Sequence, residues 1–185
     1  MVMTPDSEDN TRLRILSVLV ENKPRVLARI AGLFARRGFN IHSLAVAPTD
    51  NPAFSRMTIA AFGDERTTEQ MTKQLNKLIN VIKVVELSEQ TSVCRELMLI
   101  QVQAPPEVRA QLIEISDVFR AKVVDVGADS LIIECKGTPD KLHALEDLLR
   151  PYGIIEMTKT GRIAIQRGPK IKPARLVRQL APATA

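Results

Sequence analysis

Residues 13 to 44 constrain the possible fold more than any other stretch of the sequence. An apolar run rich in Ile, Leu and Val over residues 13 to 20 predicts a strand covered by helices on at least one face. Pro24 ends this run, and its fixed φ suits the first turn of a helix. Gly38 supplies a left-handed stop, after which a second strand is expected from Phe39. The stretch therefore predicts a strand, a tight loop, an amphipathic helix and a returning strand.

The expected helix carries one apolar stripe. Four apolar residues recur at helical spacing, two more are expected to widen the stripe, and three arginines are expected to reach solvent. The stripe consists of Val26, Ile30, Leu33 and Phe34, the widening residues are Leu27 and Ala31, and the arginines are Arg29, Arg36 and Arg37.

The next residues complete a folding unit. Strands are expected over residues 39 to 47 and 56 to 62, joined by a turn into a hairpin. A second helix then leads to a strand over residues 81 to 87. This helix is expected to be capped by Thr67 or Thr68 and lined by Met71, Leu75, Leu78 and Ile79. The order of strand, helix, strand, strand, helix, strand is typical of a ferredoxin-like sandwich.

The same order repeats after residues 88 to 93, which are polar and lack periodicity. Strands are expected over residues 96 to 102, 122 to 126, 131 to 135, 154 to 158 and 162 to 166, and helices after Pro105 and Gly137. We therefore predict an α+β fold of two ferredoxin-like βαββαβ domains in tandem. The predicted divisions are a disordered tail (1–11), a first domain (12–88), a linker (89–93), a second domain (94–168) and a basic, disordered tail (169–185).

The formal charge of +5 resides at the C-terminal end. From Arg167 onward there are five basic residues and no acidic one, so residues 1 to 166 hold 21 basic and 21 acidic side chains. Aromatic residues make up only 3% of the chain, which leaves little material for stacking on bases. A nucleic-acid binder acting through the tail is an alternative that predicts strongly salt-dependent binding. The neutral body of the chain argues against it, so we expect no nucleic-acid partner.

The residues for most kinds of catalytic and metal site are missing. No glycine-rich phosphate loop or Gly-x-Ser-x-Gly elbow occurs, and neither His42 nor His143 has a second ligand at metal-binding spacing. Cys94 and Cys135 lie in apolar runs and are expected to be small core residues in a reducing compartment. We therefore predict no catalytic residue, no metal site and no cofactor in this chain.

No membrane or secretory segment is expected. The first eleven residues are polar and acidic, and no apolar run approaches the ~20 residues that span a bilayer. These features predict a soluble, cytoplasmic protein without a membrane partner.

The loop between the first strand and the first helix is the best candidate for a binding site. The first N–H groups of a helix are unpaired and carry partial positive charge, which favours a carboxylate. Asn22 adds an amide that donates and accepts, while Asn40 and Ile41 offer a polar group and an apolar wall. These features suit a small zwitterion with an aliphatic side chain. The alternative is that Asn22 only shapes the loop and Asn40 only tolerates an unusual dihedral angle after Gly38.

The segment VENKPRVLARIAGLFARRGFNIHSLAV resembles the ACT-domain signature of the regulatory (small) subunit family of acetohydroxyacid synthase, also called acetolactate synthase. The similarity continues through residues 55 to 59, 73 to 85, 92 to 103 and 161 to 168, and it covers about residues 12 to 169. The resemblance implies that the first predicted domain is an ACT domain that dimerises. The second would be the C-terminal ferredoxin-like domain of the small subunit.

The resemblance implies a non-catalytic partner of a large subunit. That large subunit would carry thiamine diphosphate, Mg²⁺ and FAD and form acetolactate in valine, leucine and isoleucine biosynthesis. The small subunit would activate it and confer feedback inhibition, usually by valine, as part of a transferase complex. The implied effector-binding residues are Asn22, Arg25, Val26, Asn40 and Ile41.

Two positions depart from the family pattern. Arg25 stands where the family usually has glycine, and His42 stands where glutamate is common. Because glycine lets the backbone approach a ligand closely, Arg25 is expected to weaken or alter valine feedback. A stand-alone amino-acid-sensing ACT protein with a different partner remains the alternative function.

Overall fold

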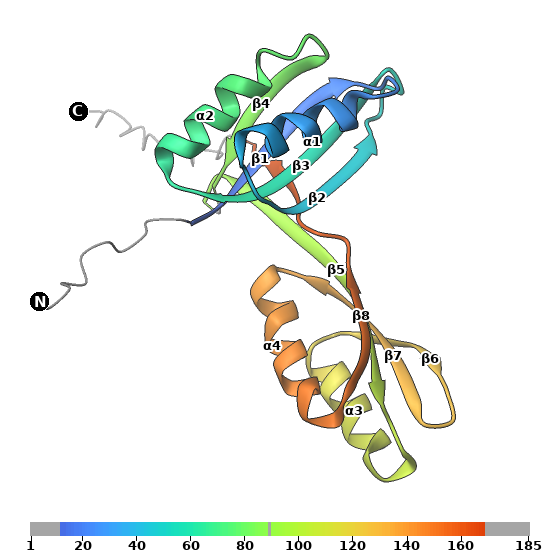
Figure 1. Cartoon of the computed structure of the whole chain (residues 1–185). Coiled ribbons are helices and arrows are strands. Elements are labelled where there is room, and N and C mark those ends of the chain that lie inside the picture. Colours follow the sequence, from blue (N-terminus) through green and yellow to red (C-terminus); the bar gives the residue numbers. More distant parts are fainter. Residues whose placement is uncertain (1–11, 89, 169–185) are drawn as a thin grey trace, which may run out of the picture.

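The computed structural model describes residues 12 to 88 and 90 to 168, so both predicted tails lie outside the described residues (Figure 1). The first unit contains β1 (Arg12–Glu21), α1 (Val26–Arg37), β2 (Ile41–Pro48), β3 (Phe54–Gly63), α2 (Glu65–Leu75) and β4 (Val81–Leu87). The second contains β5 (Ser92–Gln103), α3 (Pro106–Val118), β6 (Lys122–Val126), β7 (Ser130–Gly137), α4 (Pro139–Leu149), the 3₁₀ turn η1 (Arg150–Tyr152), β8 (Ile154–Lys159) and β9 (Ile163–Gln166).

The two units share one topology, which confirms the predicted fold class. The first sheet has the order β2-β3-β1-β4 and the second β6-β7-β5-β8, with antiparallel neighbours throughout. Each unit packs its two helices on one face of its sheet (Figure 1). Each has its own apolar core, built around Leu16, Ile30 and Ile59 in the first unit and Ile100, Leu112 and Leu142 in the second.

The start and the width of α1 differ from the sequence prediction. Pro24 lies in a turn before the helix, and Arg25, in the left-handed conformation with φ 71°, is the N-cap residue. The stripe of Val26, Ile30, Leu33 and Phe34 is buried as predicted, and Gly38 is the left-handed C-cap. Leu27 and Ala31 are exposed, so the prediction that they widen the buried stripe is wrong. On α1, the narrower stripe alone is buried against the first core.

The ends of α2 also differ from the prediction. Asp64, rather than Thr67 or Thr68, is the N-cap, and its carboxylate accepts a hydrogen bond from the Thr67 N–H at 2.7 Å. Hydrogen bonding from the Thr67 side chain, and then from its backbone N–H, lowers the pKa of Asp64 because it favours the charged form. The helix ends at Leu75, so Ile79 lies beyond it and is 88% exposed. Aspartate is a better N-cap residue than threonine, so the local sequence already favoured Asp64.

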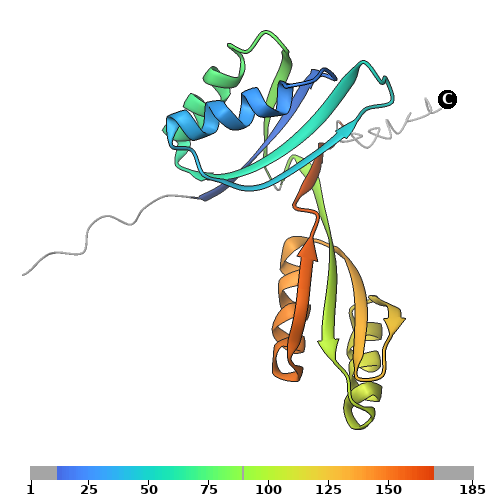
Figure 2. The same cartoon turned by 45° about the vertical axis from the view of Figure 1, so that its right-hand side comes forward.

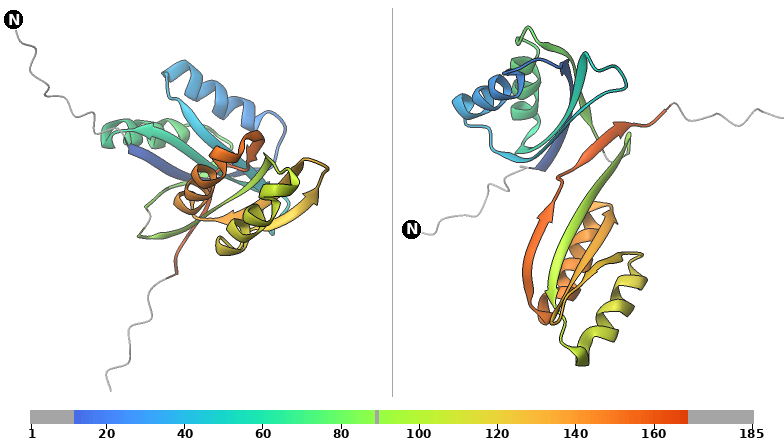
Figure 3. Two further views of the ribbon diagram at one scale, coloured as in Figure 1. Left: turned by 90° about the horizontal axis from the view of Figure 1, so that it is seen from below. Right: turned by 90° about the vertical axis from the view of Figure 1, so that its right-hand side faces the viewer.

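The junction between the units is a two-stranded ribbon. β5 begins at Ser92 rather than at Glu96, so residues 92 and 93 of the predicted linker belong to a strand. Ser92–Arg95 pair antiparallel with Ile163–Gln166 of β9, while the rest of β5 pairs with β7 and β8. The views in Figures 2 and 3 show β5 and β9 running side by side from the second unit to the first.

A small apolar cluster attaches this ribbon to the first sheet. Ile15 and Leu87 of the first unit pack with Ala164 of β9, and Cys94 is partly buried beside them. Cys135 is fully buried in the second core, as predicted, and its thiol is not in a disulfide. Among the described residues, no helix is both long and apolar enough to cross a bilayer.

Gly161 lies in the turn before β9, close to Ser43 of the first unit. Its φ is +75°, and a Cβ atom placed there would lie 2.9 Å from the Cβ of Ser43 in β2. The backbone N–H of Arg162 also lies 3.5 Å from the Ser43 hydroxyl oxygen. The junction therefore requires a residue without a side chain at position 161.

We predict that Gly161→Ala lowers the free energy of unfolding by at least about 1 kcal/mol, because alanine is strained in the left-handed region. The contact with Ser43 adds to that strain. Urea unfolding of the full chain measures the effect. Gly168→Ala is the matched control, since a Cβ atom added at Gly168 would meet nothing within 4 Å. The free energy of unfolding of this variant should stay within about 0.5 kcal/mol of the wild-type value. Equal stability of the two variants would contradict the assigned role of Gly161.

Candidate functional site

The loop between β1 and α1 is held against the loop between β2 and β3. The backbone N–H of Asn22 donates to the Ala53 carbonyl at 2.7 Å, and its side-chain Nδ2 donates to the Pro52 carbonyl at 2.9 Å. Asn22 thus shapes the loop, in agreement with one of the two interpretations of this residue. Its Oδ1 oxygen is still an acceptor at an exposed position.

Arg25 has the most unusual backbone in this loop. Among the described residues, Arg25 and Arg120 are the non-glycine residues with positive φ. The left-handed conformation is strained for a residue with a Cβ atom. Because Arg25 is exposed, its guanidinium group is available at the rim of the loop. The loop therefore adopts the backbone that a glycine would favour while carrying a cation.

The start of α1 presents free N–H donors. The N–H groups of Leu27 and Ala28 make no hydrogen bond within residues 12–88 and 90–168, and α1 has no acidic residue in its first turn. Such a helix end attracts an anion. Val26 is only 4% exposed and belongs to the core, so its side chain faces away from any ligand at the surface.

Asn40 and Ile41 lie at the other end of α1. They follow the helix, whereas Asn22 and Arg25 precede it, and twelve residues of helix separate the two pairs, which corresponds to about 18 Å. The strand register agrees, because Ile41 pairs with Ala61 while Pro48, at the far end of β2, pairs with Ser55 beside the Asn22 loop. Within one chain, the predicted site residues therefore form two separate groups.

The local environments of Asn40 and Ile41 differ. Asn40 is exposed and has an ordinary negative φ, so the interpretation that it tolerates an unusual dihedral angle is wrong. Ile41 is partly buried and packs against the first core. His42 beside them is exposed and makes an edge-to-face contact with Phe62, with ring centroids 5.3 Å apart.

A polar network behind the loop contains residues that the sequence analysis missed. The Asn80 amide nitrogen donates to a Glu21 carboxylate oxygen at 2.6 Å, and the Asn80 amide oxygen accepts from Arg29 at 3.0 Å. Lys23 pairs with the other Glu21 oxygen at 3.1 Å. The bond from Asn80 is the main cause, and Lys23 a further cause, of a lowered pKa of Glu21. The network ties the loop to α1 and to the start of β4.

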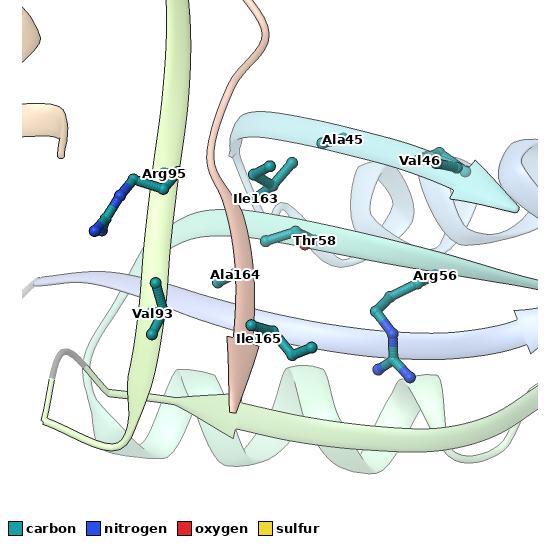
Figure 4. Close-up of a pocket in the computed structure, with 10 residues that line it drawn as sticks. Ala45, Val46, Arg56, Thr58, Val93, Arg95, Ile163, Ala164 and Ile165 are labelled. Carbon is teal, nitrogen blue, oxygen red and sulfur yellow. The ribbon is translucent and has the colours of Figure 1, made fainter. Parts of the chain in front are cut away.

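An apolar groove of about 370 Å³ lies where β2 and β3 face the β5–β9 ribbon (Figure 4). Ile163 and Ile165 point into this region from β9 and are 54% and 66% exposed. The residues that line it include two arginines but no carboxylate, histidine, cysteine or serine. Its composition suits contact with an apolar surface and does not provide a general acid–base pair.

The second histidine, His143, lies on the exposed side of α4. His143 has a side chain that is 70% exposed and lies 3.5 Å from Asp147, so it is a surface residue as predicted. Within the described parts of the chain, no group of three or more His, Cys, Asp or Glu side chains is arranged to hold a metal ion.

Two family models match this chain. The one described as an AHAS small subunit-like ACT domain matches residues 16–83, and the one described as the small subunit of acetolactate synthase matches residues 95–168. Together they cover both structural units.

Relatives with the same printed name align over most of the chain. An acetolactate synthase small subunit from Mycolicibacterium smegmatis is 56% identical over 162 residues, which are 88% of this chain and 95% of the relative. One from Mycobacterium bovis is 54% identical over 155 residues, which are 84% of this chain and 92% of the relative. The crystal structure of the small subunit from Thermotoga maritima has a TM-score of 0.80 and 38% identity, covering 86% of this chain and 99% of that chain.

The backbone at position 25 gives a prediction that is independent of any ligand. Because Arg25 is left-handed, we expect Arg25→Gly to be more stable to urea than Arg25→Ala by about 1 kcal/mol. Arg29, inside α1, is the matched control. There the order should reverse, with glycine less stable than alanine by about 1 kcal/mol. If glycine is also the worse residue at position 25, the left-handed assignment is wrong.

Proposed function

Because this chain belongs to the acetolactate synthase small-subunit family, we propose that it binds and activates a catalytic large subunit and confers feedback control by valine. The large subunit would hold thiamine diphosphate, Mg²⁺ and FAD and carry out acetolactate formation for valine, leucine and isoleucine synthesis in the cytoplasm. This chain would contribute no catalytic residue and no cofactor. Two observations support a regulatory role. The chain has an ACT unit with an exposed polar loop, and no acid–base pair lines its apolar groove.

The separation of the site residues favours an effector site between two copies. β2 is an edge strand, and within the described residues no strand pairs with its outer side. In a two-fold symmetric dimer, two β2 strands would pair antiparallel, which places the start of one beside the end of the other. Asn40 and Ile41 of one copy would then approach the Asn22 loop of its partner. This geometry is the main support for a homodimer formed through the ACT units.

The chemistry of the joined site suits a branched-chain amino acid. The free N–H groups of Leu27 and Ala28 can hold the carboxylate, and the Asn22 oxygen can accept from the ammonium group, while the Arg25 side chain stands at the rim. Ile41 provides apolar surface for the side chain. Val26 would act through its backbone alone, since its side chain is buried.

A site shared between two copies predicts complementation between single variants. Asn22→Ala and Asn40→Ala homodimers should each bind valine at least about tenfold more weakly than wild type. When the two variants are mixed and allowed to exchange subunits, half of the sites in each mixed dimer are intact. Isothermal titration calorimetry should therefore recover wild-type affinity at reduced stoichiometry.

Mixing two batches of the same variant is the control, and it should restore nothing. A site confined to one chain would also show no recovery in the Asn22→Ala and Asn40→Ala mixture, and that result would overturn the shared site. The oligomeric state before and after mixing is followed by light scattering.

The position of Arg25 gives a second prediction. We expect the large subunit reconstituted with wild-type chain to show increased acetolactate formation but weak inhibition by valine. With Arg25→Gly, inhibition should become several-fold stronger, because glycine keeps the left-handed backbone and removes the side chain from the rim. Activation without valine should be unchanged. Equally strong valine inhibition of the complexes with wild-type chain and with Arg25→Gly would refute the proposal that Arg25 weakens feedback. Valine binding without any effect on the large subunit would instead favour a stand-alone sensor.

A further inference from the structure

A polar pocket lies in the C-terminal unit, separate from the loop between β1 and α1. It has a volume of about 220 Å³ and lies where the start of β5, the start of α4 and both ends of β9 meet. Its lining consists of Ser92, Cys94, Arg95, Thr138, Pro139, Asp140, Arg162 and Arg167. Three of the eight residues are arginines: Arg95 comes from β5, and Arg162 and Arg167, more than sixty positions later, flank β9.

None of the three guanidinium groups forms an ion pair with a carboxylate of the described residues. Arg95 donates to the Cys94 carbonyl at 2.6 Å, and Arg167 donates through Nε to the Ser92 carbonyl at 3.0 Å. These bonds hold the two side chains in place but leave their charges uncompensated. By contrast, Arg14 and Arg150 elsewhere each pair with a glutamate.

The orientation of the side chains relates this pocket to the groove. In Figure 4 the guanidinium group of Arg95 points away from Ile163 and the groove. Arg162 is half-buried, and its backbone N–H contacts the Ser43 hydroxyl oxygen. The pocket and the apolar groove therefore lie on different sides of the same ribbon and share Arg95.

The start of α4 adds positive potential to the pocket. Thr138, the N-cap residue, makes no capping hydrogen bond through its side chain, and the eleven-residue helix directs its N-terminal end at this point. Asp140 is the one carboxylate among the lining residues. Three guanidinium groups and one carboxylate leave a net formal charge of +2 around the pocket.

We propose that this pocket binds a phosphate group. A phosphate carries about −1.5 to −2 charges at pH 7 and several strong acceptor oxygens. The charge of a phosphate therefore balances the net charge of +2 around the pocket. Planar guanidinium groups bind phosphate oxygens through paired N–H donors. A single carboxylate would neutralise only half of this charge. The bound group would connect the start of α4 to the β5–β9 ribbon, which forms the junction between the two units. This inference does not depend on the valine site.

Isothermal titration calorimetry of the full chain with inorganic phosphate, at constant ionic strength set by chloride, tests the proposal. We expect saturable binding, and at least a tenfold loss of affinity in Arg162→Gln and in Arg167→Gln, because each removes a charged donor. Phosphate should also raise the unfolding temperature of the wild-type chain, since a ligand of the native state stabilises it.

Arg36→Gln is the matched control, because Arg36 lies in the last turn of α1, outside the pocket. Its affinity for phosphate should equal that of wild type. The unfolding transition of each variant, measured without phosphate, shows whether that variant is folded. Acetate, at the same concentration, distinguishes a phosphate site from a general anion site. The proposal fails if phosphate does not bind, if acetate binds as tightly, or if folded Arg162→Gln and Arg167→Gln bind phosphate like wild type.

Discussion

The β5 strand is the element on which the arrangement of the molecule depends. One stretch of twelve residues pairs with β9 at its start and with β7 and β8 along the rest, so it belongs to the ribbon and to the second sheet at once. Ala164 and Cys94 then attach this ribbon to the first sheet at Ile15 and Leu87. Backbone hydrogen bonds and a small apolar cluster, rather than a flexible linker, therefore connect the two units.

The sequence predicted the elements well because their signals are local. The stripe from Val26 to Phe34 and the return strand after Gly38 follow from spacing within one helix and one turn. The junction could not be predicted in this way. Ser92 lies in a polar stretch typical of a linker, yet it is only 3% exposed because it pairs with Gln166. That pairing joins residues more than seventy positions apart and has no signature in either segment alone.

The candidate site shows the same division between local and distant information. Asn22, Arg25 and the helix start could be chosen from residue chemistry near a predicted turn. The left-handed backbone of Arg25 could not, since arginine gives no local reason to expect it. Asn80 escaped notice because its role depends on contact with Glu21 across the sheet. The sequence also could not show that Asn40 lies at the opposite end of α1 from Asn22, and this separation is what supports the proposed site between two copies.

The contacts of Ser43 bring the two candidate binding regions close together. Ser43 lies two residues after Ile41 in β2, its hydroxyl oxygen lies 3.5 Å from the backbone N–H of Arg162, and its side chain occupies the space that a Cβ atom at Gly161 would need. Arg162 in turn lines the arginine pocket. Ser43 therefore links the start of β2, which carries Ile41 of the proposed valine site, to Arg162 of the proposed phosphate pocket. Because an equilibrium shifts only when a ligand interacts differently with two states, coupling between these regions requires that this turn has a second arrangement. Ser43 and Gly161 are where such an arrangement would have to differ.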